Sequence, residues 1–280
     1  MISDLIFFLF TVFITTGCTD STNLPVTLKD SSLVTTSLNT NHDQFEADFK
    51  TIHVMVALCD NRYQGIIPVP AGIGNGQDPD HNLYWGCGYG VSSYFRKSRN
   101  WTMVRSTHLD SIKLERLVFR SKKGKYYLVA DAYNGKYIKQ CTIDFLKSCA
   151  GQVKDTLHIE GNVIGIFGNA ALLAYTGHDG LMDFQLPQNY KGTDSKKRKA
   201  IILACMSKRY FHTRLSETGA EPLLWSTGLM SPEAYTLHDA LESYMNNETA
   251  DRVRNSAANA YAKYQHCSVH AAKNLLVTGW

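Results

Sequence analysis

Two reactive side chains follow two buried apolar segments of the chain. The segment 171–177 is followed directly by His178, and the segment 200–205 ends in Cys205. A cysteine thiolate is a nucleophile, and an imidazole within a few ångströms can lower the pKa of the thiol and protonate a leaving amine. If the two segments are neighbouring parallel strands, His178 and Cys205 lie at the same edge of the sheet. The sequence therefore indicates a Cys/His dyad.

Alternating strand and helix patterns must position these two residues. The runs 171–177, 200–205 and 222–228 are almost unbroken apolar sequence, which is typical of strands buried on both faces. The repeated order of strand and helix predicts an α/β fold, with a mostly parallel sheet and helices on both faces. The other expected elements are strands at 52–59, 114–120 and 126–133, and helices over 83–97, 136–151, 231–244 and 248–265.

The order of these motifs resembles a known family of cysteine peptidases. A small residue precedes His178, Gly180 follows it, and the next apolar strand ends in Ala-Cys at 204–205 before a Ser. This order is similar to the caspase, legumain and gingipain type, clan CD, including the CHAT group, over about residues 165–245. The resemblance implies a caspase-like three-layer sandwich, His178 as general acid/base, Cys205 as nucleophile, and no metal or organic cofactor.

The position after the histidine departs from that family, which usually has Gly there. In this chain Asp179 stands between His178 and Gly180. Family members hold the oxyanion with the N–H of the cysteine and an N–H just after the histidine, so the resemblance assigns Asp179 and Gly180 to oxyanion or loop support. The departure leaves open a reshaped loop, an Asp179 that orients or acidifies the pocket, or an inactive site that binds a peptide or protein partner in the same groove.

A second cysteine competes for the role of nucleophile. Cys87, in WGCGYG, precedes an expected helix and is similar to the nucleophile region of papain-like peptidases, where a helix N-terminus lowers the thiol pKa. Those enzymes need a histidine after the cysteine, whereas the Asp-Pro-Asp-His segment 78–81 precedes Cys87. Cys87 is therefore an alternative nucleophile or part of the substrate groove. The resemblance adds Trp225 and Ser226, near the end of 222–228, to that groove.

The N-terminal segment predicts export from the cytoplasm. Residues 1–17 form an apolar run whose uninterrupted part, residues 5–14, is too short to span a membrane as a helix, and Cys18 follows two small residues. This resembles a bacterial lipoprotein signal peptide and implies a lipid anchor on Cys18 at the cell envelope; a plain secretory signal is the alternative. Residues 18–44, rich in Ser, Thr and Asn, are expected to form a tether, and 45–280 one domain.

Composition and charge narrow the classes of function. The 280 residues are 44% hydrophobic and 19% charged, which is typical of a globular protein. The net charge of +4 is spread thinly apart from the basic run 196–199, expected to be a solvated loop or else a processing site, so a nucleic-acid partner is not predicted. The chain has no CxxC pair, and no metal site is expected. The predicted partners are a peptide or protein substrate and, through Cys18, a membrane.

Overall fold

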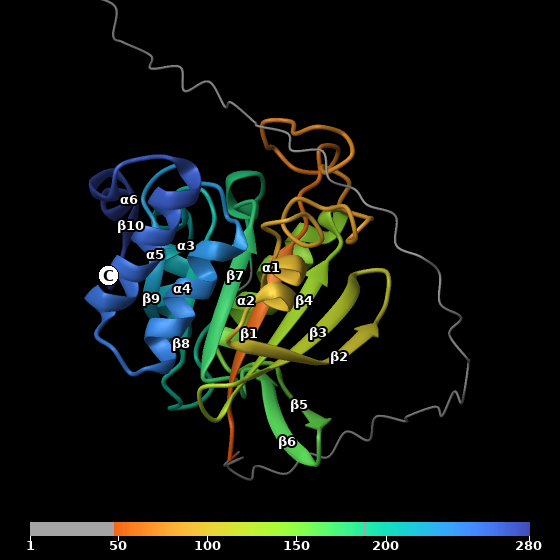
Figure 1. The fold of residues 1–280 in the computed structure, drawn as a ribbon, viewed down its shortest axis with the longest axis vertical. Helices are drawn as coiled ribbons and strands as arrows, with labels where there is room; N and C mark the ends of the chain where they lie inside the picture. Colours follow the sequence, from red (N-terminus) through yellow and green to blue (C-terminus); the bar gives the residue numbers. More distant parts are fainter. Residues whose placement is uncertain (1–47, 188) are drawn as a thin grey trace, which may run out of the picture. The chain divides into compact units, whose positions relative to one another are not determined.

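A mixed sheet forms the centre of the fold in this computed structural model, which describes residues 48–187 and 189–280 (Figure 1). Within the described residues its strands are β1 (Lys50–Ala57), β2 (Trp101–His108), β3 (Lys113–Ser121), β4 (Tyr126–Tyr133), β7 (Leu172–Gly177), β8 (Lys199–Leu203), β9 (Glu221–Ser226) and β10 (Leu276–Val277). They lie in the order β10-β9-β8-β7-β1-β4-β3-β2. The central strands β4, β1, β7, β8 and β9 are parallel, whereas β2, β3 and β10 join antiparallel.

Helices cover both faces of this sheet. They are α1 (Val91–Lys97), α2 (Ile138–Cys149), α3 (Ser207–Thr218), α4 (Ala234–Met245), α5 (Ala250–Gln265) and α6 (Val269–Leu275), with a small hairpin of β5 (Lys154–Ile159) and β6 (Asn162–Phe167). Side chains alternate along the strands: Val54 faces α1, α4 and α5, whereas Met55 faces α2 and α3. The predicted fold class, a mostly parallel α/β sheet with helices on both faces, is confirmed.

The expected helix over 83–97 is wrong in its first half. Helix α1 begins only at Val91, and the residues before it form turns. Two glycines explain the difference, because each lies against another part of the backbone. A Cβ at Gly86 would stand 1.8 Å from the Asp80 carbonyl oxygen, and one at Gly90 would stand 2.4 Å from the Trp85 carbonyl oxygen. Glycine at these positions permits a folded-back loop, which ends where α1 starts.

A buried ionic network ties the centre of the sheet together. His53 on β1 lies 3.0 Å from Asp131 on β4, and Arg116 on β3 donates two hydrogen bonds to the same carboxylate, at 2.6 and 2.7 Å. The Phe167 N–H donates to Nδ1 of His53 at 2.9 Å, so Nε2 carries the proton that Asp131 accepts. Burial lowers the pKa of His53 and keeps the ring neutral, against the attraction of Asp131.

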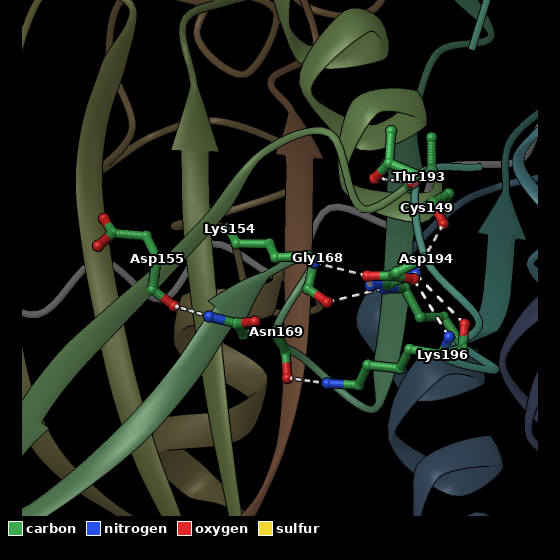
Figure 2. A network of polar contacts seen from close by, with 10 residues as sticks. Cys149, Lys154, Asp155, Gly168, Asn169, Thr193, Asp194 and Lys196 are labelled. Atoms are coloured by element: carbon green, nitrogen blue, oxygen red, sulfur yellow. Dashed lines mark hydrogen bonds and ion pairs between the residues drawn. The ribbon is translucent and has the colours of Figure 1, made fainter. Parts of the chain in front are cut away.

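A second ionic network anchors the segment that enters β8 (Figure 2). Arg198 is 1% exposed and donates to both oxygens of Asp194, at 2.8 and 2.7 Å, and to the Gly168 carbonyl at 2.7 Å. Lys154 reaches the same Asp194 carboxylate at 2.6 Å, and Nζ of Lys196 donates to the Asn169 carbonyl. The expectation of a fully solvated basic loop is therefore wrong at Arg198, whose burial is made possible by its paired carboxylate.

The predicted signal segment 1–17, Cys18 and the tether 18–44 lie outside the described residues. The described residues belong to a compact unit, Gln44–Trp280. Among the helices of the described part, none has both the length and the apolar character needed to cross a membrane.

Candidate functional site

His178 and Cys205 follow neighbouring strands at the carboxyl edge of the parallel sheet. β7 pairs with β8 in parallel, and the last paired residues are Thr176 and Leu203. His178 and Cys205 each stand two positions beyond these residues. Because paired strands run about 4.8 Å apart, both residues reach the same edge of the sheet. The predicted arrangement of the two strands, adjacent and parallel, is confirmed.

A glycine shapes the end of β7 where His178 leaves the sheet. Gly177 has a φ of 137°, and a Cβ there would stand 2.4 Å from the carbonyl oxygen of Ala57 on β1. Only glycine combines this backbone conformation with so close an approach. The carbonyl of His178 then accepts a hydrogen bond from the Tyr175 hydroxyl at 2.7 Å. The backbone that carries the histidine is thus fixed on both sides of its turn.

An aspartate that the sequence analysis missed orients the histidine ring. Nε2 of His178 lies 2.7 Å from Oδ2 of Asp183, which also accepts the Gly65 N–H at 2.9 Å. The short helical turn η2 (Gly180–Met182) brings Asp183 back toward the ring. His178 is 6% exposed, while the Asp183 side chain is 26% exposed. A carboxylate five residues after a histidine, with a glycine between them, is the signal that was available in the sequence.

Cys205 lies in the turn between β8 and α3. Met206 adopts a left-handed conformation with φ 51°, and α3 begins at Ser207. This strand, turn and helix arrangement places the thiol just before the first turn of α3. The Sγ atom lies 3.4 Å from the Met230 nitrogen and 3.5 Å from the Met230 carbonyl oxygen. The side chain is half-buried.

The environment of Cys205 favours the neutral thiol. Burial raises the pKa of this thiol, the Met230 N–H opposes the rise, and the charge of Asp179 adds to it. A group with a raised pKa attacks a carbonyl only when a base removes its proton during the reaction. His178 leaves the neighbouring strand at the same sheet edge, while the hydrogen-bond contacts of the Cys205 Sγ atom are with the Met230 backbone.

Asp179 and Gly180 form the turn between His178 and Asp183. Oδ1 of Asp179 accepts the Leu181 N–H at 2.9 Å, whereas Oδ2, fully buried, has no hydrogen-bond partner among the described residues. Burial raises the pKa of this carboxyl to about 7, and the charge of Asp183 contributes, against the Leu181 N–H. A Cβ at Gly180 would lie 2.6 Å from the Phe184 ring. These two residues therefore shape the loop that brings Asp183 to the histidine.

Trp225 and Ser226 do not line an accessible groove. Both side chains are 0% exposed. Ser226 Oγ accepts the Ser207 N–H at 3.1 Å, and the Ser226 N–H donates to Ser207 Oγ at 2.9 Å, so Ser226 ties β9 to the start of α3. Trp225 packs on the sheet face that α2 and α3 cover, where it stacks with the His212 ring at 6.1 Å. The expectation of a groove role is wrong, because β9 is covered on both faces.

Cys87 lies in a loop, four positions ahead of the first residue of α1. Its N–H donates to the Asn82 carbonyl at 3.0 Å, and its Sγ lies 3.1 Å from the His81 carbonyl oxygen. The His81 ring pairs with Asp78 at 2.9 Å and is 73% exposed. A papain-like nucleophile needs the first turn of a helix, and the turns of residues 88–90 separate Cys87 from α1.

Within residues 48–187 and 189–280, no three His, Cys, Asp or Glu side chains are grouped closely enough to hold a metal ion. No protein-family model, curated protein or solved structure matches the chain.

Proposed function

We propose that the chain is a cysteine peptidase of the caspase, legumain and gingipain type, in which Cys205 attacks the peptide carbonyl and His178 moves the proton. One observation carries this proposal. The parallel strands β7 and β8 are followed by His178 and Cys205 at the same edge of the sheet, and Asp183 holds Nε2 of the His178 ring at 2.7 Å. This order of nucleophile, base and orienting carboxylate is what nucleophilic catalysis by a thiol requires.

The pair with Asp183 sets the tautomer of His178. A carboxylate accepts hydrogen bonds, so Nε2 of the neutral ring carries the proton and Nδ1 carries the lone pair. Nδ1 is therefore the base for the Cys205 thiol. When the ring becomes an imidazolium, the Asp183 carboxylate stabilises the new charge without taking the proton.

Acylation follows from these roles. Nδ1 of His178 takes the thiol proton while Sγ of Cys205 forms a bond to the substrate carbonyl carbon, which gives a tetrahedral oxyanion. Backbone N–H groups after the histidine and at the cysteine are the candidate donors to this oxyanion. The imidazolium then gives its proton to the amine nitrogen, the C–N bond breaks, and the amine leaves the thioester behind.

Deacylation repeats the sequence with water. Nδ1 of His178 removes one proton from a water molecule as its oxygen adds to the thioester carbon. The C–S bond then breaks, the proton returns to the sulfur of Cys205, and the carboxylic acid product leaves. Every proton passes through the same ring, so loss of His178 blocks both halves of the reaction.

The decisive experiment maps the cysteine that reacts with a peptidyl acyloxymethyl ketone in the folded protein. The probe places a carbonyl beside the thiol as a substrate does, so Cys205 is labelled when His178 can take its proton. Labelling of Cys205 that His178→Ala slows at least about 100-fold supports the proposal. Cys267→Ala removes another half-buried thiol, and this control keeps wild-type labelling.

Two results would overturn the assignment. Labelling of Cys205 only after unfolding would mean that this thiol belongs to the core and that the domain serves at most to bind a partner. Preferential labelling of Cys87 would favour the papain-like alternative.

We also propose, from the sequence of residues 1–18, that the protein is lipid-anchored at a bacterial envelope through Cys18. Expressed in a bacterial host with radiolabelled palmitate, the wild type should take up label and fractionate with membranes. Cys18→Ser should lose both properties, and equal labelling of the two forms would exclude Cys18 as the anchor.

A further inference from the structure

Basic side chains gather at the amino edge of the sheet, opposite the edge that carries His178 and Cys205. The parallel strands β1, β4, β7, β8 and β9 begin at this edge, β2 begins beside them, and β3 ends there. The side chains belong to segments far apart in sequence, and all are exposed except the last, which is half-buried. They form the basic row: Lys50, Arg99, Lys122, Lys123, Lys125, Lys197 and Lys199.

The turn between β3 and β4 joins one half of the basic row. Arg99 precedes Asn100, whose carbonyl accepts the Lys122 N–H at 2.9 Å. At the other end of the same turn, the Lys125 carbonyl accepts the Lys50 N–H at 2.9 Å. The turn therefore connects the segment before β2 with the start of β1, and the charges of these three segments are neighbours in space.

The start of β7 joins the other half of the row to β1. The Ala171 N–H donates to the Thr51 carbonyl at 2.9 Å, and the Ala171 carbonyl accepts the Lys199 N–H at 3.1 Å. Lys197, exposed, stands two residues before Lys199 in the basic segment that enters β8. The row is thus continuous along the edge, although the sequence spreads its members from β1 to β8.

Few carboxylates neutralise the basic row. Lys123 pairs with Glu242 on α4 at 3.2 Å, and Lys199 pairs with Glu221 at the start of β9. Asp48 is a third carboxylate, exposed just before β1. For the other members of the row, no carboxylate of the described residues lies within ion-pair distance. The amino edge therefore presents a surface of positive potential.

The carboxylates near the candidate catalytic residues are too distant to cancel this potential. Strand β1 has eight residues, so the two edges of the sheet lie about 25 Å apart. Charges in physiological salt are screened over about 8 Å. Asp179 and Asp183, at the carboxyl edge, thus contribute little to the field that a partner meets at the basic row.

The chain also enters the domain at this edge. The first described residue, Asp48, stands two positions before Lys50 and β1. If the residues between Cys18 and Asp48 form the flexible tether that their composition predicts, its ends are separated by about 30 Å on average. A lipid anchor on Cys18 would therefore hold the basic row close to the surface of the bilayer.

We infer that the basic row is a docking surface for a bilayer of anionic phospholipids. The inference goes beyond the peptidase proposal, and its choice of partner rests on the proposed anchor at Cys18. Lysines predominate in the row, and they attract phosphate groups as point charges without a fixed geometry. Each basic side chain near such a surface strengthens binding about fivefold. Docked by this edge, the protein holds His178 and Cys205 on the side away from the bilayer.

The test measures binding to lipid vesicles by the full chain with Cys18→Ser, which carries no lipid. One set of vesicles contains phosphatidylglycerol and phosphatidylcholine in equal parts, and the other contains phosphatidylcholine alone. Co-sedimentation at increasing lipid concentration gives the two affinities, and their ratio cancels what the apolar segment 1–17 contributes to both. The anionic vesicles should bind at least about 100-fold more tightly.

A variant and a matched control locate this preference in the fold. The variant replaces three exposed lysines of the basic row: Lys122→Gln, Lys125→Gln and Lys197→Gln. The control removes the same charge from exposed positions at the carboxyl edge: Arg62→Gln, Lys136→Gln and Lys139→Gln. The variant should lower the ratio of affinities below about fivefold, whereas the control should stay within about threefold of the parent protein.

Three results would overturn the inference. They are a ratio near one for the parent protein, an equal loss in the control, and tighter binding to duplex DNA than to the anionic vesicles at equal phosphate concentration. The last result would make the amino edge a nucleic-acid surface. The assay depends neither on lipidation nor on turnover, so the anchor and the peptidase proposals are decided by their own experiments.

Discussion

Two histidine–aspartate pairs in this protein have similar distances but different surroundings. His53 and Asp131 meet at 3.0 Å in the middle of the sheet, and both are 0% exposed. His178 and Asp183 meet at 2.7 Å at the sheet edge, where the Asp183 side chain is 26% exposed. The first pair has Arg116 bound to its carboxylate, whereas the second has Cys205 just after the next strand of the sheet.

The two histidines differ in the partner of the ring nitrogen that the aspartate does not contact. In His53 the Phe167 N–H occupies Nδ1, so neither nitrogen can accept a proton from another group. In His178 the aspartate occupies Nε2, and no hydrogen bond to Nδ1 is found among the described residues, so the proposed mechanism uses Nδ1. A histidine–aspartate contact alone therefore does not identify a catalytic base; the partner of the other nitrogen decides its chemistry.

The largest expected effect is a loss of activity with little change in stability. His178→Ala should lower kcat at least about 1000-fold, because proton transfer in both reaction steps is lost. Its free energy of unfolding should change by less than about 1 kcal/mol, because Asp183 remains in contact with water. Turnover of a fluorogenic peptide and urea denaturation measure the two quantities. An unchanged kcat would show that His178, like His53, has a structural role only.

The buried pair should respond in the opposite way. Asp131→Ala leaves the guanidinium of Arg116 buried without its carboxylate, so the free energy of unfolding should fall by about 3–5 kcal/mol. The kcat of the remaining folded protein should stay within about twofold of the wild type. Urea denaturation followed by circular dichroism gives the first value. A loss under about 1 kcal/mol would show that the network does not support the sheet.

Asp183→Asn tests whether orientation of the ring matters separately from its presence. The amide can no longer stabilise the imidazolium, so kcat should fall about 100-fold or more while KM changes little. Asp78→Asn is the matched control, because Asp78 also contacts a histidine but at an exposed loop. A fall in kcat equal to that of the control would remove Asp183 from the mechanism.

Asp179 gives a pH test near the site. Burial raises its pKa to about 7, above the unfolded value, so the folded protein binds the proton more tightly. Its contribution to stability is therefore greatest at low pH and is lost as the pH rises from about 4 through about 7. Asp179→Asn should raise the free energy of unfolding by about 2 kcal/mol at pH 8 and leave it nearly unchanged at pH 4. Equal effects at both pH values would exclude titration as the cause.

The smallest expected effect concerns His53, which should lower the stability of the protein as the pH falls rather than as it rises. Its pKa is lowered from 6.5 by burial, so the unfolded chain binds the proton more readily. Stability is then lost as the pH falls below about 6.5, with a slope of at most about 1.4 kcal/mol per pH unit. His53→Gln should flatten this part of the stability profile between pH 6.5 and 5. A slope that persists in the variant would assign the effect to another group.

The fold and the ends of its strands could be predicted from local patterns. Continuous apolar runs and their order were enough to place His178 and Cys205 at one sheet edge, because parallel strands with helical crossovers bring their carboxyl ends together. Trp225 shows that the same pattern also predicts burial of the side chains near the end of a strand. Its strand was expected to be buried on both faces, and its side chain is 0% exposed, which conflicts with a role in a groove.

The position of Asp183 depends on a turn, and turns carry a weaker sequence signal than strands. Asp183 reaches His178 only because Asp179 and Gly180 start a short helical turn, and Asp179 is the residue that departs from the expected motif. The course of this turn decides whether Asp183 reaches the ring, and a spacing of five residues alone does not specify it.

The buried Arg198 has a consequence for the lifetime of the protein. A protease that cuts after basic residues must hold an extended segment of chain in its own cleft. At Arg198 this would first require both bonds to Asp194 and the bond to Gly168 to break. The loss of that anchor would release the start of β8 and, with it, the strand that carries Cys205. Cleavage after Arg198 is therefore governed by how often this anchor opens, whereas the exposed Lys196 and Lys197 just before it lack that protection.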